Sequence, residues 1–140
     1  MAEARVGVIR GVSLVIPAYN EEGAVGDVVR DFTAAFESSL PSDPAVDRAT
    51  PDAHAEFEIL VVDDGSSDAT AREASEAGAT VVSSPQNQGY GLALRRGIVA
   101  ARFEHVIICD ADGTYPPTAV KDLVSLAEHF DMVIAERTGP

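Results

Sequence analysis

Short apolar runs, rich in Val and Ile, limit the fold of this 140-residue chain more than any other feature. Four of them lie at 12–16, 59–62, 106–109 and 132–135, and the shorter stretch at 80–83, with Val81 and Val82, is expected to add a fifth strand. Their nearly unbroken apolar character is typical of central strands in a parallel sheet that is covered on both faces. The chain is therefore predicted to build its core around five strands.

Helical periodicity fills the intervals between these runs. Apolar residues spaced by three and four predict helices over 22–38, 89–102 and 116–130. A turn at 64–68 begins a further helix, which ends at Gly78. Strand and helix alternate, which predicts an open, mostly parallel α/β sheet with right-handed crossovers and helices on both faces.

Local signals refine the ends and faces of these helices. We expect Asn20 to cap the first helix, because Asn is a favoured N-cap residue. Ile98 and Phe130 continue the apolar stripes of the third and fourth helices, so both are expected to point inward.

The length of the chain suits a single domain across residues 1–140. Residues 39–56 contain three prolines and almost no large apolar side chain, so we expect a mobile surface loop there. The chain stops at Pro140, directly after the last expected strand, which suggests that it is truncated at the C-terminus.

Composition excludes several classes of partner and site. The formal net charge of −13 argues against nucleic acid or an anionic membrane as a partner of this segment, because both attract basic surfaces. Cys109 is the single cysteine, so no internal disulfide forms, and its place in an apolar run predicts a core residue. No apolar stretch approaches the roughly 20 residues that span a bilayer, and the N-terminus lacks a signal-peptide core. We expect cytoplasmic exposure.

Polar clusters follow four of the five runs. They lie at 17–22, 63–66, 110–114 and 136–137. In open α/β sheets, ligands bind outside the carboxyl ends of the strands, so all four clusters are expected to line one crevice.

The expected crevice is strongly acidic. Its carboxylates are Glu21, Glu22, Asp63, Asp64, Asp110 and Asp112, and Arg137 is the nearest base. A bare phosphate would be repelled there, whereas Mg²⁺ or Mn²⁺ held by Asp110 and Asp112 would reverse the local charge and bridge a diphosphate. Arg137 is then expected to offset charge on the far side of that diphosphate. Neither a phosphate loop with a Lys nor a GxGxxG turn follows the first run.

Three side chains are suited to bind a nucleoside. Asp64 can accept hydrogen bonds from the edge of a base, Tyr19 can cover a base face, and Glu21 can accept from a ribose hydroxyl. For each of them the alternative is a surface turn or a helix cap. Asn87 and Gly89 are interpreted as a turn that leads into the third helix.

Four motifs resemble family 2 glycosyltransferases of the GT-A fold, and within that family they are most similar to dolichyl- and polyprenyl-phosphate sugar transferases. They are VIPAYNEE at 15–22, VVDDGSSD at 61–68, NQGYG at 87–91 and DAD at 110–112. The resemblance implies a Rossmann-like GT-A sheet. It also implies an inverting, metal-dependent transfer of a sugar from a UDP- or GDP-linked donor to a polyprenyl phosphate or another lipid or glycan acceptor.

The same resemblance implies roles for individual residues. Those expected to bind the nucleotide-sugar donor are Pro17, Ala18, Tyr19, Glu21, Asp64, Asp110, Ala111 and Arg137. Asp110 and Asp112 are expected to hold Mg²⁺ or Mn²⁺. The general base, the acceptor-binding region and any membrane-associated helices are expected beyond Pro140, which would place the full-length protein at the inner face of the membrane.

Two positions depart from the family pattern. Thr114 stands where many relatives have Gln, and Tyr90 stands where some relatives have Lys. Two other functions remain open at this point. Residues 107–114 also resemble the first motif of haloacid-dehalogenase-type phosphatases, and a non-catalytic module that binds nucleotide sugars would carry the same donor motifs.

Overall fold

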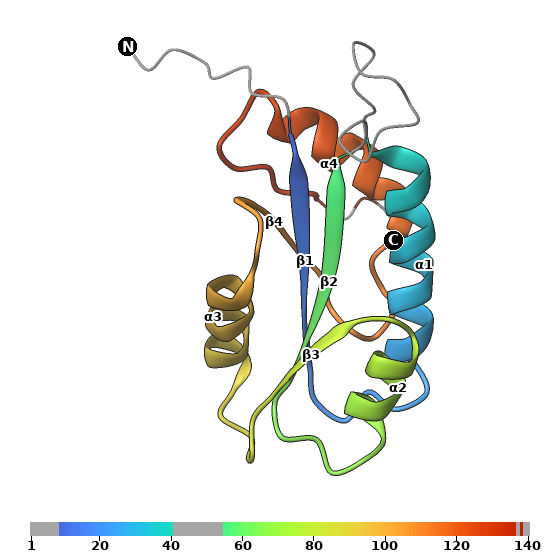
Figure 1. The fold of residues 1–140 in the computed structure, drawn as a ribbon, viewed down its shortest axis with the longest axis vertical. Coiled ribbons are helices and arrows are strands. Elements are labelled where there is room, and N and C mark those ends of the chain that lie inside the picture. Colours follow the sequence, from blue (N-terminus) through green and yellow to red (C-terminus); the bar gives the residue numbers. More distant parts are fainter. Residues whose placement is uncertain (1–8, 41–54, 137, 139–140) are drawn as a thin grey trace.

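The computed structural model describes residues 9–40, 55–136 and 138 (Figure 1). Its elements, in chain order, are β1 (Gly11–Ala18), α1 (Val25–Ser39), β2 (Glu56–Asp63), α2 (Thr70–Glu76), β3 (Thr80–Ser83), α3 (Tyr90–Ala100), β4 (His105–Ile108), a short 3₁₀ helix (Pro117–Ala119) and α4 (Val120–Ala127). The alternation of strand and helix confirms the predicted α/β class.

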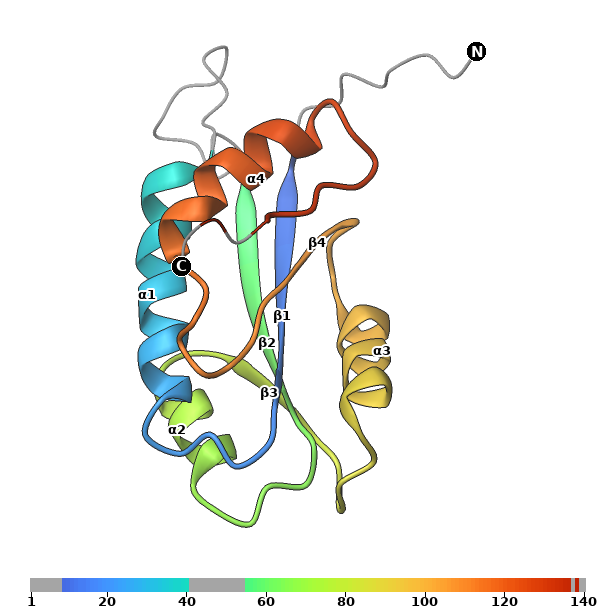
Figure 2. The same cartoon turned by 180° about the vertical axis from the view of Figure 1, so that it is seen from behind.

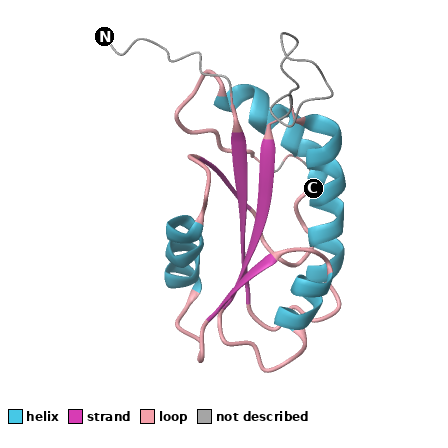
Figure 3. Ribbon diagram, in the orientation of Figure 1, coloured by secondary structure: helices cyan, strands magenta, loops and turns pink. Residues whose placement is uncertain are grey.

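The four strands of the described part of the chain form one parallel sheet in the order β3-β2-β1-β4 (Figure 3). β1 is central and pairs along its whole length with β2, so that Ala18 lies opposite Asp63 at the carboxyl end. β4 pairs with the other edge of β1, with Ile108 opposite Val15. Because all strands run in one direction, the segments that follow β1, β2 and β4 emerge at the same edge of the sheet.

Helices cover both faces of this sheet (Figures 1 and 2). Successive side chains of a strand point to opposite faces, and β1 follows this rule. Leu14 and Ile16 pack in one buried cluster with α1, α2 and α4, whereas Val15 packs on the other face in a cluster with Ala93 of α3. β1 is therefore covered on both faces, and for this reason nearly all of its side chains are apolar.

The fifth predicted strand is wrong. Residues 132–135 adopt no regular structure, and Met132 and Ile134 are each 77% exposed. An apolar run becomes a strand only where a neighbouring strand accepts its hydrogen bonds, and in the described structure this run lies outside the sheet. Phe130 lies beyond the end of α4 and is also exposed, whereas Val120 and Val124 of the same predicted apolar stripe are buried.

Two further local predictions are wrong. α1 begins at Val25, and its N-cap position is Ala24, so Asn20 does not cap it. Ile98 is half exposed, because α3 approaches the sheet through the small residues Ala93 and Gly97.

The loop predicted for residues 39–56 is shorter than expected at both ends. Ser39 is the last residue of α1, and Glu56 is the first residue of β2. Residues 41–54 lie outside the described residues. Within the described part of the chain, no helix is both long enough and apolar enough to cross a membrane.

Gly97 allows the close approach of α3, and this can be tested. A Cβ atom at this position would lie 2.3 Å from Cγ1 of Val15 and 2.9 Å from Cγ2 of Val62. We therefore expect Gly97→Ala to lower the free energy of unfolding by about 1–3 kcal/mol through overpacking, as measured by urea denaturation.

Gly91 is the matched control in the same helix, because a Cβ atom there meets nothing within 4 Å. Gly91→Ala should leave stability unchanged or raise it by up to about 1 kcal/mol, since Ala has the higher helix propensity. Equal effects of the two substitutions would contradict the packing argument.

Candidate functional site

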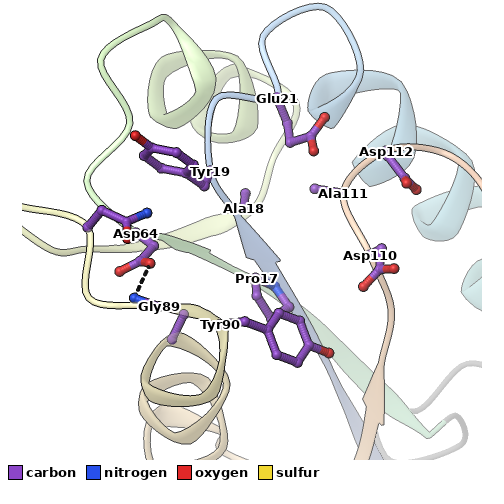
Figure 4. A pocket seen from close by; sticks show the side chains of 12 residues that line it. Pro17, Ala18, Tyr19, Glu21, Asp64, Gly89, Tyr90, Asp110, Ala111 and Asp112 are labelled. Atoms are coloured by element: carbon purple, nitrogen blue, oxygen red, sulfur yellow. Dashed lines mark hydrogen bonds between the residues drawn. The ribbon is translucent and has the colours of Figure 1, made fainter.

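A pocket of about 440 Å³ opens at the carboxyl edge of the sheet (Figure 4). We call it the carboxyl-end pocket. Its lining residues are Pro17, Ala18, Tyr19, Glu21, Asp64, Asn87, Gly89, Tyr90, Ala93, Asp110, Ala111 and Asp112. Every predicted site residue in the described chain is among them, so the three strand ends do converge on one crevice. Arg137 lies outside the described residues.

The loop after β1 brings Tyr19 and Glu21 to the pocket, and Asn20 fastens it. Asn20 has a positive φ of 51°, a conformation that Asn tolerates better than most residues. Its backbone N–H donates to Oγ of Ser66 at 2.9 Å, and its Oδ1 accepts from the backbone N–H of Ser67 at 2.9 Å. Asn20 therefore links the turn after β1 to the turn after β2.

Side chains of the β2–α2 region accept the next three backbone N–H groups of the same loop. The N–H of Glu21 donates to Oγ1 of Thr70 at 2.8 Å, and Thr70 is completely buried. The N–H of Glu22 donates to Oδ2 of Asp68 at 3.2 Å, and that of Gly23 donates to Oε2 of Glu73 at 2.8 Å. The hydroxyl of Thr70 in turn donates to Oδ1 of Asp68, and this bond is the main cause that lowers the pKa of Asp68 below its ordinary value of 3.8.

Asp64 lies at the end of β2 and is 4% exposed. Its two carboxylate oxygens accept the backbone N–H groups of Gln88, at 3.0 Å, and Gly89, at 2.8 Å. Gly89 precedes α3 with a φ of 101°, in the region that favours glycine. Asp64 thus holds the start of α3 against the end of β2. Residues 87–89 lead into α3 as predicted, but no turn is assigned to them.

Asp110 and Asp112 follow β4 on the opposite side of the pocket from Asp64 (Figure 4). Asp110 is half-buried, Ala111 between them is buried, and Asp112 is exposed. Oδ1 of Asp112 accepts from the backbone N–H of Thr114 at 3.0 Å and from its hydroxyl at 2.7 Å. Thr114 therefore supports Asp112 through a short turn, in which Gly113 has a φ of 80°.

The described lining of the pocket includes four carboxylates and no Lys, Arg or His. Their oxygens are the ligands that Mg²⁺ and Mn²⁺ prefer, so the donor set of Asp110 and Asp112 fits such an ion. Among the described residues, however, no three His, Cys, Asp or Glu side chains are grouped closely enough to hold a metal ion alone. Backbone carbonyls, water or a bound phosphate can supply further oxygen ligands.

Comparison with known proteins decides the family. Residues 13–140 match the family described as Glycosyl transferase family 2. The chain belongs to this family. It is 36% identical over 135 residues to an undecaprenyl-phosphate 4-deoxy-4-formamido-L-arabinose transferase of Salmonella paratyphi A, an alignment that covers 89% of this chain and 36% of that protein.

Solved structures of two sugar-phosphoglycerate synthases are similar in fold. Glucosyl-3-phosphoglycerate synthase from Mycobacterium tuberculosis is similar with a TM-score of 0.64 and 28% identity, over 84% of this chain and 39% of that one. Mannosyl-3-phosphoglycerate synthase from Rubrobacter xylanophilus is similar with a TM-score of 0.56 and 31% identity, over 73% of this chain and 30% of that one. The chain thus spans well under half the length of these relatives.

The comparisons also inform two earlier expectations, the divalent metal ion and the alternative of a phosphatase. The M. tuberculosis synthase has been solved with Mn²⁺ and UDP-glucose, and also with Mg²⁺ and UDP. The resemblance of residues 107–114 to a phosphatase motif is not supported, because the whole matched segment belongs to family 2 and Asp110 follows the fourth strand.

Burial and the nearby charge of Asp110 raise the pKa values of two residues, Tyr90 and Cys109. Burial, followed by the negative charge of Asp110, raises the pKa of the Tyr90 hydroxyl above its ordinary value of 10.0. Burial likewise raises the pKa of the Cys109 thiol to about 12. Cys109 is 3% exposed, so the prediction of a core residue is confirmed.

The predicted set of crevice residues was partly wrong. Glu22 and Asp63 do not line the pocket; Glu22 is exposed, and Oδ1 of Asp63 accepts the backbone N–H of Ser66. Tyr90 and Ala93 line it but received no pocket role from the sequence. The available signal was their place in the first turn of a helix that starts at the carboxyl edge of the sheet.

Thr70 connects the loop that carries Tyr19 and Glu21 to Asp68. Thr70→Val keeps the shape of the side chain but leaves the backbone N–H of Glu21 without its buried acceptor. We expect the free energy of unfolding to fall by about 1–3 kcal/mol, as measured by urea denaturation. Thr70→Ser keeps the hydroxyl and should recover most of this loss, so a defect as large as that of Thr70→Val would contradict the proposed bond.

Asp68 should make stability depend on pH. Because its pKa is lowered in the folded state, its contribution is complete above the unfolded-state value near 3.8 and is lost as the pH falls through the lower folded value. Asp68→Asn should therefore be less stable than the wild type near neutral pH, and the difference should shrink on acidification. Urea midpoints measured from about pH 6 to about pH 3 test this. A difference that stays constant over this range would contradict it.

Proposed function

We propose that the chain forms the nucleotide-sugar-binding part of a glycosyltransferase. The reaction is the inverting transfer of a sugar from a UDP- or GDP-linked donor to a polyprenyl phosphate or another lipid or glycan acceptor. The acceptor class is supported by the name of the Salmonella relative, an undecaprenyl-phosphate sugar transferase. The donor class is supported by the M. tuberculosis synthase, which was solved with UDP-glucose.

One observation carries the proposal: the carboxyl-end pocket joins two chemically different ends. Tyr19 and Asp64 lie at one end, and Asp110 and Asp112 lie at the other (Figure 4). An aromatic ring beside a buried carboxylate suits a base with N–H groups on its edge. We place the base near Tyr19 and Asp64, the ribose near Glu21, and the diphosphate near Asp110 and Ala111.

The acidic lining makes a cation necessary for this arrangement. Asp110 and Asp112 would hold Mg²⁺ or Mn²⁺, which would supply the positive charge that a leaving nucleoside diphosphate needs. Thr114 keeps Asp112 oriented through its two hydrogen bonds. Arg137, which lies outside the described residues, is proposed to offset charge on the far side of the diphosphate. The general base remains a prediction for a position beyond Pro140, and so does membrane association.

Calorimetric titration tests the donor site directly. UDP, GDP, UDP-glucose and GDP-mannose are titrated into the chain with Mn²⁺ present, and again with chelator. We expect one nucleotide and its conjugate to bind, and chelation to abolish most of the affinity, because the carboxylates would otherwise repel the diphosphate. Binding of no probe to the folded chain would overturn the proposal.

Asp112→Asn isolates the metal contribution, because Asn keeps an oxygen that can accept from Thr114. We expect metal-dependent binding of the nucleotide to weaken by about 1–3 kcal/mol, the scale of one charged contact. Asp122→Asn, in the first turn of α4 and outside the pocket, is the control and should bind like the wild type. Unchanged affinity in Asp112→Asn would remove Asp112 from the metal site.

A further inference from the structure

We infer that Tyr90 contacts the sugar of the nucleotide-sugar donor and thereby distinguishes the sugar conjugate from the bare nucleotide. This inference rests on the proposed function. Tyr90 received no role from its sequence pattern beyond a departure from the Lys of some relatives.

Tyr90 stands at the wall of the carboxyl-end pocket with much of its ring uncovered. It is the first residue of α3, and it is 57% exposed although it lines the pocket. Figure 4 shows its hydroxyl on the Asp110 side, whereas Tyr19 lies on the Asp64 side. The pocket therefore presents one aromatic ring at each of its two ends.

Asp64, a residue of the pocket lining, fixes the backbone segment that precedes Tyr90. Asp64 accepts the N–H groups of Gln88 and Gly89, the two residues that precede Tyr90. One turn further along α3, Ala93 is buried at 1% exposure and also lines the pocket. A small side chain there leaves space beside the ring. Tyr90 is thus presented to a ligand from a fixed position, which lowers the entropy cost of contact.

The chemistry around Tyr90 suits a sugar better than a phosphate. A hexose offers an apolar face of C–H groups that an aromatic ring can cover, and hydroxyls that donate to carboxylates and accept from a phenol. Tyr90 supplies both the ring and the phenol. Asp110 and Asp112 are assigned to the metal and the diphosphate, and the sugar is the part of the donor that follows the diphosphate, so the ring of Tyr90 on the Asp110 side is left to cover the sugar.

Two substitutions separate a sugar contact from a general effect. In the presence of Mn²⁺, UDP and UDP-glucose, and in parallel GDP and GDP-mannose, are titrated into Tyr90→Leu, Tyr90→Phe and the wild type. For Tyr90→Leu we expect the conjugate to bind on the order of tenfold more weakly, while the bare nucleotide stays within about twofold. Tyr90→Phe keeps the ring and should lose only part of this factor.

Controls and contrary outcomes make the test decisive. Phe130→Leu changes another exposed aromatic residue outside the pocket and should bind every probe like the wild type. Equal weakening of nucleotide and conjugate in Tyr90→Leu would mean a contact with the nucleotide and would overturn the inference. Unchanged binding of both would mean an uninvolved surface ring and would also overturn it. If the wild type binds no probe, the proposed function fails first, and this inference fails with it.

Discussion

The geometry of the carboxyl-end pocket depends on side chains from the β2–α2 region that accept the backbone N–H groups of residues 20–23. The chain leaves β1 at Ala18 and enters α1 only at Val25, so these groups have no partners within a regular element. Their acceptors are Ser66, Thr70, Asp68 and Glu73. Because the acceptors come from the next crossover of the sheet, the first loop is held by residues more than forty positions away in sequence. Tyr19 and Glu21 reach the pocket through this loop.

A second tie of the same kind positions the other wall. Both carboxylate oxygens of Asp64 accept backbone N–H groups just before α3, the helix that carries Tyr90. The motif at 61–68 thus contributes to two loops: Ser66 and Asp68 accept N–H groups of the loop after β1, and Asp64 holds the start of α3. The carboxylates after β4 meet the pocket from the other side of β1. In the proposed function they hold the cation that offsets the acidic lining.

Part of this arrangement was predictable, because it follows from short-range rules. Unbroken apolar runs predicted β1 to β4, and the positions directly after them predicted Tyr19, Glu21, Asp64, Asp110 and Asp112 as pocket residues. Predictions that depended on which distant segment a residue packs against or bonds to were less successful. Residues 132–135 have the composition of a strand but do not lie in the described sheet, and Asn20 links two turns where a helix cap was expected. Ile98 fits a helical stripe, yet Gly97 sets the face that α3 presents to the sheet.

The sequence by itself determined the α/β class, the family and the acidic edge at which a ligand would bind, since each of these depends on residue type and spacing along one chain. Only the tertiary structure decided which carboxylates line the pocket and which backbone N–H groups each of them accepts. Asp63 and Asp64 are neighbours of identical chemistry, but one accepts the N–H of Ser66 and the other fastens α3 beside the pocket. Successive residues at the end of a strand point in opposite directions, so their roles depend on what the folded chain places on each side.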